Sequence, residues 1–176
     1  MREYKTQTKE LILTTTFSTP IGEMFAAASK KGIITLSFFT PFNIEAKIQT
    51  LKNTLEADVV PGNCEIFDML KIQLIEYFKK ERTTFEIPLQ LIGSPFQVKC
   101  WKELLKIPYG KTISYKEQAI NIENEKASRA VKNANLQNMI AILVPCHRVI
   151  SSNEDLGEYN SGVEKKEFLL KLEKND

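Results

Sequence analysis

The chain has few of the residues that bind structural metals or cross-link secreted domains. Its 176 residues include one histidine and three cysteines. Cys64, Cys100 and Cys146 are odd in number and far apart, with no Cys-x-x-Cys pair, so neither a disulfide framework nor a zinc cluster is predicted. We expect a protein of a reducing compartment, cytoplasmic or, in a eukaryote, nuclear, with no metal and no other cofactor.

Long apolar runs are also missing. No window approaches the roughly 18 apolar residues of a membrane span, and the charged start MREYKTQTKE has no apolar signal-peptide core. The hydrophobic fraction of 43% and the charged fraction of 26% are typical of globular proteins. We expect a soluble, untargeted protein with no membrane partner, built from one domain or two small ones.

The formal net charge of +2 hides an uneven distribution. Residues 1–90 hold 11 basic and 11 acidic side chains, whereas residues 99–150 hold 9 basic and 4 acidic ones. A local basic excess fits an anionic partner that docks on this segment, but an ordinary solvated face produces such a count more often. The excess alone does not identify a nucleic-acid-binding protein.

Hydrophobic patterning gives the first half an alternation of strands and helices. Strands are predicted at residues 11–19, 22–29, 32–39 and 84–91. Pro88 pushes the last of them towards a sheet edge. Helical spacing of apolar residues predicts helices at residues 44–55 and 66–78. This half is expected to be a small α/β (α+β) unit without a catalytic cluster.

The second half is predicted to be mostly helical. SPFQ and SYKE each place a serine, Ser94 and Ser114, at a helix N-cap with the partner residue of a capping box three positions later. Further helices are predicted at residues 125–135 and 163–174. Two short helices joined by polar residues in the basic segment resemble a helix-turn-helix. The small residues around Arg129 fit a packing face and a groove-binding face equally well.

The single histidine lies in the run ILVPCHRVI, directly after Cys146. Taken singly, a free cysteine is most often a small buried hydrophobe, and a lone histidine is an ordinary surface or core residue. Glu173, however, falls on the apolar side of the last helix, where a carboxylate needs a partner. An imidazole can take a thiol proton while an acid orients the ring. The three side chains together therefore predict an activated thiol.

The expected arrangement runs from Glu173 to His147, then through a water to Cys146. Adjacent residues of an extended chain face opposite sides, and one bridging water would solve this. The result would be a thiolate in an apolar pocket next to a DNA-binding element. Local signatures of thiol hydrolases are absent. Such a thiolate suits displacement at an alkyl carbon carried by a nucleic-acid base, and because a thioether is a poor leaving group, the protein would be consumed.

The run V-P-C-H-R-V at residues 144–149 resembles the Pro-Cys-His-Arg signature of the 6-O-alkylguanine-DNA alkyltransferases, also called methylated-DNA–protein-cysteine methyltransferases. The resemblance extends from Ser94 to Glu173 through SPFQVKCW, IPYGKTISY, ASRAV, Asn138 and KEFLLKLE. It implies a ribonuclease-H-like α/β domain at residues 1–90 and a mostly helical domain with a helix-turn-helix at residues 91–176.

The resemblance also implies a reaction. Cys146 would accept a methyl or other alkyl group, once and irreversibly, from the 6-oxygen of guanine in double-stranded DNA, with 4-O-alkylthymine left open as a second substrate. His147 and Glu173 would be the water-linked base and its orienting acid. Asn138 would brace the turn, and Tyr115 would approach the flipped nucleotide and donate a proton towards the guanine. A monomer is expected.

Further residues gain DNA-binding roles from the resemblance alone. Arg129 would enter the stack from the minor groove and fill the space of the extruded base. Lys116, Asn124 and Ser152 occupy positions where the family touches DNA, although a solvated polar residue explains each almost as well. The residues expected to line the guanine pocket are Val149, Tyr159 and Asn160.

The sequence departs from the family pattern at several positions. Lys132 and Asn133 stand where glycine is common, Asn160 and Ser161 interrupt the usual Tyr-x-Gly-Gly, and Leu172 replaces a histidine. These changes could alter how closely the helix meets DNA or how the loop covers the guanine. Two alternatives stay open beside repair: a DNA-binding regulator whose cysteine senses alkylation or oxidation, and a thiol hydrolase.

Overall fold

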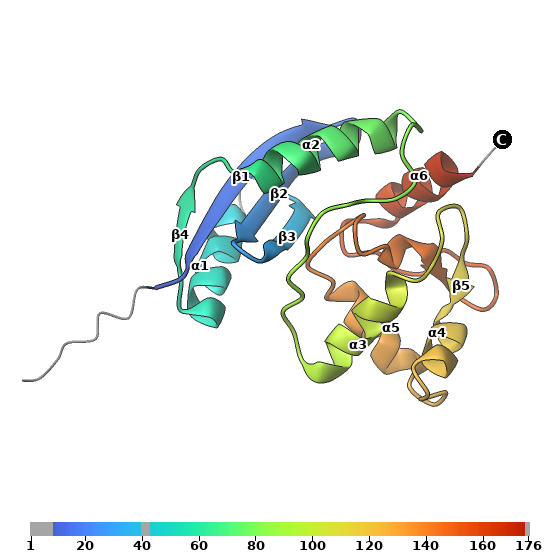
Figure 1. Cartoon of the computed structure of the whole chain (residues 1–176). Coiled ribbons are helices and arrows are strands. Elements are labelled where there is room, and N and C mark those ends of the chain that lie inside the picture. Colours follow the sequence, from blue (N-terminus) through green and yellow to red (C-terminus); the bar gives the residue numbers. More distant parts are fainter. Residues whose placement is uncertain (1–8, 40–42, 175–176) are drawn as a thin grey trace, which may run out of the picture.

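The computed structural model describes residues 9–39 and 43–174 (Figure 1). Its first half is built on a four-stranded sheet of order β3-β2-β1-β4. The strands are β1 (Leu11–Thr19), β2 (Gly22–Ser29), β3 (Gly32–Phe38) and β4 (Asp58–Pro61). β1 to β3 form an antiparallel meander, and β4 pairs in parallel with β1. The first three strands confirm the sequence prediction, apart from one residue at the end of β3.

The two helices of this half, α1 (Ile44–Leu55) and α2 (Glu65–Phe78), cover opposite faces of the sheet. Alternation along β2 explains this arrangement: Met24 packs in the cluster that contains Leu70 of α2, whereas Phe25 packs in the cluster that contains Leu51 of α1. Because both faces are covered, β2 is apolar on both sides rather than alternating with polar residues.

The prediction of a strand at residues 84–91 is wrong. The segment makes one isolated bridge, Ile33 with Leu89, and its hydrogen bonds to β3 run from Ile33 N to Pro88 O (2.9 Å) and from Gln90 N to Ile33 O (2.8 Å). Pro88 has no N–H to extend the ladder. The chain therefore touches the edge of β3 and continues to the second half. The sequence reasoning also missed β4, which has only four residues.

The second half is mostly helical, as predicted. Its elements are α3 (Pro95–Leu104), β5 (Ile113–Ser114), α4 (Tyr115–Asn121), α5 (Ser128–Leu136), η1 (Cys146–Arg148), β6 (Val149–Ile150) and α6 (Val163–Glu173). Both capping boxes are present, with Ser94 paired to Gln97 and Ser114 paired to Glu117. The predicted third helix begins three residues late, at Ser128, and no side-chain hydrogen bond caps its start.

Helices α4 and α5 form the predicted helix-turn-helix pair, held by a buried amide exchange. Gln118 Nε2 donates to Asn135 Oδ1 (3.1 Å), and Asn135 Nδ2 donates to Gln118 Oε1 (2.7 Å). Val131 is buried in the core, whereas Arg129 is exposed on the same helix. The two interpretations of α5 therefore apply to different sides of it: one side packs and the other faces outward.

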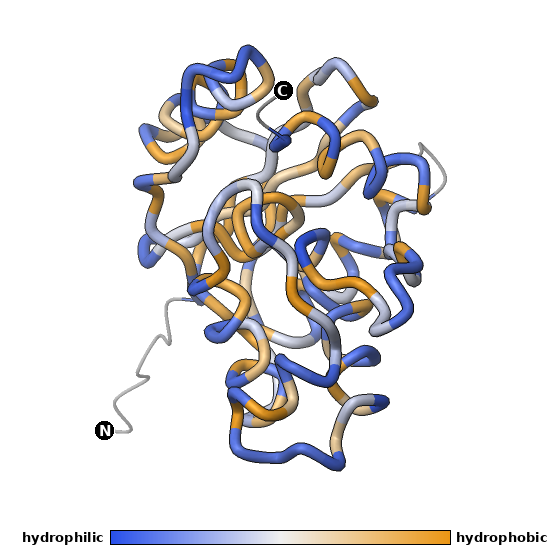
Figure 2. The backbone as a smooth tube through the Cα atoms, turned by 90° about the vertical axis from the view of Figure 1, so that its right-hand side faces the viewer, coloured by the Kyte–Doolittle hydropathy of each residue, from blue (hydrophilic) through white to orange (hydrophobic). Residues whose placement is uncertain are grey.

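Figure 2 shows the hydrophobic stretches gathered towards the middle of the molecule and hydrophilic loops around the outside. Within residues 9–39 and 43–174, no helix combines the length and the apolar character needed to cross a membrane. The core of the second half continues into the cluster that fills the space between the sheet and α2.

Candidate active site

Cys146 and His147 lie in a 3-10 turn, not in the extended chain that the sequence reasoning assumed. Pro145 precedes the turn, and its carbonyl oxygen accepts a hydrogen bond from Arg148 N (3.0 Å). Successive side chains of a 3-10 helix diverge by about a third of a turn, and they point in different directions from the buried backbone. His147 is 0% exposed and Cys146 is 7% exposed. Both therefore sit inside the protein, on separate sides of the turn.

Asn138 ties this turn together, as its expected bracing role requires. Its Nδ2 lies 2.8 Å from Val144 O, 3.2 Å from Ile140 O and 3.3 Å from Cys146 Sγ, and its Oδ1 accepts a bond from Ile140 N (3.0 Å). The side chain is 8% exposed. One amide thus fixes the backbone that leads into the turn and presents an N–H to the sulfur.

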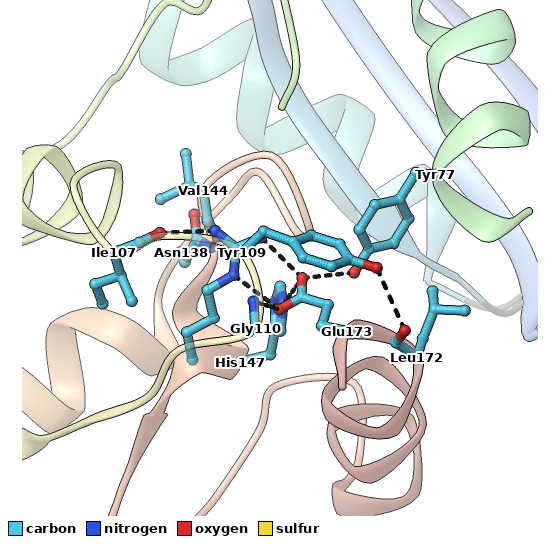
Figure 3. A network of polar contacts seen from close by, with 10 residues as sticks. Tyr77, Ile107, Tyr109, Gly110, Asn138, Val144, His147, Leu172 and Glu173 are labelled. Atoms are coloured by element: carbon cyan, nitrogen blue, oxygen red, sulfur yellow. Dashed lines mark hydrogen bonds and ion pairs between the residues drawn. The ribbon is translucent and has the colours of Figure 1, made fainter. Parts of the chain in front are cut away.

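Glu173, at the end of α6, is the centre of a buried polar network (Figure 3). Its Oε1 lies 2.8 Å from His147 Nε2, 2.8 Å from Arg148 Nη2 and 2.8 Å from Tyr77 Oη, and its Oε2 lies 2.9 Å from Arg148 Nε. The side chain is 1% exposed. The Gly110 N–H is a fifth and longer contact, 3.5 Å from Oε2. The carboxylate that the sequence placed on an apolar face therefore has five donors, so its burial is compensated.

The network sets the protonation of His147. Burial alone would raise the pKa of Glu173, but hydrogen bonds from His147 and Arg148 lower it to about 2. An ionised carboxylate only accepts hydrogen bonds, so His147 Nε2 must carry the proton that points at it. Burial lowers the pKa of His147, which keeps the ring neutral. Nδ1 has no hydrogen-bond partner among the described residues and is left to accept a proton.

The resting state of Cys146 differs from the thiolate expected from the sequence. Burial raises the pKa of the thiol, while the hydrogen bond from Asn138 and the charge of Lys166 act in the opposite direction. Burial has the largest effect, so the free protein holds a thiol. Transfer of its proton to Nδ1 of the neutral His147 on arrival of a substrate stays a prediction. The bridging water between them stays a prediction.

Lys166 is a site residue that the sequence reasoning missed. It is 0% exposed, and its Nζ donates to Val149 O (2.6 Å), Glu158 O (3.3 Å) and Tyr115 Oη (3.4 Å). Burial lowers its pKa to about 8. A signal did exist: Lys166 lies seven residues before Glu173, two turns along the same helix face, so it was also bound to point inward.

Two further partners of Glu173 were also missed. Arg148 follows the histidine and grips the carboxylate with two nitrogens, while its Nη1 donates to Ile107 O (2.8 Å). Tyr77 comes from α2. The first half was expected to hold no catalytic cluster, and it nevertheless supplies this hydroxyl. Nothing local in the sequence marks Tyr77, because the contact spans 96 positions.

Of the residues expected at the guanine, Tyr115 and Tyr159 lie near Cys146. Tyr115 is 8% exposed, and burial, then Cys146 and Glu158, raise its pKa to about 12. Val149 and Tyr159 are buried, and burial with the nearby Cys146 raises the pKa of Tyr159. Asn160, in contrast, is exposed and lines a cavity of about 420 Å³ between α1 and the loop at Asn138. Its place in the guanine pocket stays a prediction.

The residues expected to touch DNA are all on the surface. Arg129 of α5, Lys116 of α4, Asn124 in the turn between them and Ser152 after β6 are exposed. None of the four has an ion-pair or side-chain hydrogen-bond partner among the described residues. The structure therefore leaves them available to a ligand, and their DNA contacts stay predictions.

Comparison with known proteins covers both halves of the chain. The model of the 6-O-methylguanine DNA methyltransferase ribonuclease-like domain matches residues 12–91, and that of the 6-O-methylguanine DNA methyltransferase DNA binding domain matches residues 95–175. A methylated-DNA–protein-cysteine methyltransferase of Methanosarcina acetivorans is 43% identical over 157 residues, which are 89% of this chain and 95% of the relative. The chain belongs to the 6-O-methylguanine DNA methyltransferase family.

Other members of this methyltransferase family are similar along the same length. The constitutive methylated-DNA–protein-cysteine methyltransferase of Bacillus subtilis is 42% identical over 161 residues, 91% of this chain and 94% of the relative. The crystal structure of Mycobacterium tuberculosis OGT in complex with DNA has a TM-score of 0.77 at 37% identity and covers 93% of this chain and 92% of that chain. The resemblance inferred from the Pro-Cys-His-Arg run is thereby confirmed, and so is the fold that it implied.

Proposed function

We propose that this methyltransferase repairs double-stranded DNA by moving a methyl or other alkyl group from the 6-oxygen of guanine to Cys146, once per molecule and irreversibly; 4-O-alkylthymine is a candidate second substrate. The observation that carries the proposal is the Cys146 sulfur, 3.3 Å from Asn138 Nδ2, beside a histidine held 2.8 Å from a buried carboxylate. Family membership supports the reaction, and the polar network supports the assignment of its residues.

The chemistry follows from these residues. Cys146 loses its proton through water to His147 Nδ1, and the sulfur attacks the alkyl carbon. An S–C bond forms while the C–O bond to guanine breaks. Tyr115 donates a proton to the departing guanine, and Lys166, which lies 3.4 Å from its hydroxyl and has a pKa of about 8, returns one. The thioether product has no good leaving group, so the protein is not regenerated.

The DNA is proposed to bind along α5 from the minor groove. A base inside the stack cannot bring its alkyl group to a buried sulfur, so it must flip out at a cost of a few kcal/mol. Arg129, exposed on α5, is positioned to occupy the space it leaves. Lys116, Asn124 and Ser152 would contact the backbone. One monomer is expected per lesion, working in the cytoplasm or, in a eukaryote, the nucleus.

The test is alkyl transfer from a methyl-labelled oligonucleotide, followed by mass spectrometry of the protein. Wild type should gain one methyl group on Cys146 and stop, and Cys146→Ala should gain none while still binding duplex DNA. Cys64→Ala, a change at a half-buried cysteine of the first half, is the matched control and should react like wild type. Transfer retained in Cys146→Ala would move the nucleophile elsewhere, and repeated product release would favour the thiol hydrolase.

A further inference from the structure

The loop between β6 and α6, residues 151–162, runs close to Cys146, because it carries the buried Tyr159, which interacts electrostatically with that cysteine. Cys146 is only 7% exposed. The loop lies directly on Tyr115: at Gly157, whose φ is +73°, a Cβ atom would come within 2.8 Å of the Tyr115 hydroxyl. A guanine of the proposed reaction therefore cannot reach the sulfur until this loop moves away from the helix-turn-helix.

Two lysines hold the loop at a single residue, Glu158. Lys166 Nζ donates to the Glu158 backbone oxygen (3.3 Å), and Lys132 Nζ lies 3.4 Å from its carboxylate Oε1. Both ammonium groups also lie over the Tyr115 ring, 5.7 Å and 6.0 Å from its centroid. The inner lysine, Lys166, is fully buried, whereas the outer pair is open to solvent, with side-chain exposures of 34% for Lys132 and 64% for Glu158.

The outer pair is Lys132 with Glu158, and Lys132 belongs to α5, the helix that is proposed to meet DNA. Lys132 lies on α5 three residues after Arg129, so the two cations are neighbours on its surface. A phosphate that approaches Arg129 also competes with Glu158 for Lys132. Exposed ion pairs are weak and easily exchanged, so one DNA phosphate suffices to displace the carboxylate.

We infer that Lys132 and Glu158 form a clasp that keeps the loop closed over Cys146 in the free protein, and that a DNA phosphate opens it by taking Lys132 from Glu158. The clasp makes Lys132 and Glu158 specificity-determining residues. They favour guanine carried by DNA over free guanine derivatives and other small electrophiles, which bring no phosphate. This role rests on the proposed alkyl transfer and adds a gate to it.

Labelling of Cys146 by iodoacetamide, a small neutral electrophile, tests the gate without DNA. Lys132→Gln and Glu158→Gln should each speed labelling by about 1.5- to 5-fold, the range that an exposed ion pair gives. Loss of charge alone predicts opposite signs, because removing a cation slows thiolate formation and removing an anion speeds it. Cys64 in the same molecule is the internal reference, and Glu167→Gln, which breaks the exposed Lys171–Glu167 pair on α6, is the matched control.

A charge-swapped double variant, Lys132→Glu combined with Glu158→Lys, completes the test. It restores an ion pair, so its Cys146 should be labelled at the wild-type rate, and high salt should bring wild type towards the single variants. The carboxylate that the swap places on α5 would repel phosphate, so the preference of this variant for DNA over free 6-O-benzylguanine should fall below that of wild type. Equal labelling in all variants, opposite signs in the two single variants, or a swap as fast as the single variants would overturn the clasp.

Failure of the clasp is distinguishable from failure of the proposed function. Wild type that transfers alkyl groups from DNA, with variants that label alike, keeps the repair reaction and removes the gate. Wild type that transfers none, with labelling that follows the predicted pattern, keeps a gated cysteine and removes the repair reaction.

Discussion

Charged residues are buried and paired in one region of the protein and exposed and, within the described part of the chain, unpaired in another. Around Glu173, the charges are buried and matched: Arg148 and His147 each lie within 2.9 Å of the carboxylate. On the outer side of the helix-turn-helix, Lys116 and Arg129 are exposed and have no ion-pair partner among residues 9–39 and 43–174. Both regions are needed for the proposed reaction.

The difference indicates which charges stabilise the fold and which are available to bind a ligand. A buried charge that loses its partner is costly, so the network around Glu173 should contribute to stability as well as to chemistry. An exposed cation contributes almost nothing to folding. Changes in the first region should therefore lower the free energy of unfolding, whereas changes in the second should affect only the reaction with DNA.

Glu173→Gln should give the largest effect. The change leaves the Arg148 charge buried without its partner and is expected to lower the free energy of unfolding by about 3–5 kcal/mol. Urea unfolding followed by circular dichroism measures this. Alkyl transfer should also slow, since the amide can present its NH₂ to His147 and reverse the tautomer. Full stability in the variant would contradict the structural role of the network.

The same carboxylate predicts how stability depends on acid. Its pKa of about 2 in the folded protein lies below the ordinary 4.5, so the stabilisation is complete above pH 4.5 and is lost as the pH falls from 4.5 towards 2. The stability difference between wild type and Glu173→Gln should shrink over that window. A difference that stays constant down to pH 2 would show that the carboxylate is not held ionised.

Tyr77→Phe should have a smaller effect in the same direction. It removes one donor, 2.8 Å from Oε1, and leaves the contacts from His147, Arg148 and Gly110. A hydrogen bond to a charged group is worth about 1.5–3 kcal/mol, and unfolding in urea should show a loss in that range. Tyr109→Phe is a matched control in the adjacent ring, because its hydroxyl makes a longer bond, 3.3 Å, to Leu172 O. Equal losses would mean that the hydrogen bond from Tyr77 to Glu173 stabilises the protein no more than the bond from Tyr109 to Leu172 O.

Arg129→Ala should leave stability within about 0.5 kcal/mol of wild type, as for other surface changes. Transfer from duplex DNA should fall by about tenfold or more, because the alanine cannot fill the space that the flipped base leaves in the stack. Transfer from a single-stranded oligonucleotide, which needs little unstacking, should fall less. An equal fall on both substrates would assign Arg129 to phosphate binding alone.

The sequence predicted the parts of the site that are local. The capping boxes at Ser94 and Ser114 depend on residues three positions apart, and the inward position of Glu173 follows from helical spacing, so all three could be found without a structure. Family resemblance added Asn138 and Tyr115. Lys166 was within reach of the same spacing argument and was overlooked.

What the sequence could not supply were contacts made by the fold. Tyr77 reaches Glu173 across 96 positions, and no pattern near either residue marks the pair. The strand at residues 84–91 was predicted from an alternation of apolar and polar residues, which is typical of an extended chain. Pro88 and the short contact with Ile33 limit the pairing of this segment to a single bridge. The burial that keeps Cys146 a thiol also depends on the whole structure rather than on its neighbours in the chain.

Trp101, the single tryptophan, is 2% exposed and donates from Nε1 to Ala134 O, 2.9 Å away on α5. Its emission colour and lifetime depend on that bond and on the dryness around the ring. The protein consequently carries a native optical probe seated against the helix that is proposed to enter DNA. Docking and alkylation can be followed in real time by stopped-flow fluorescence, with no dye attached.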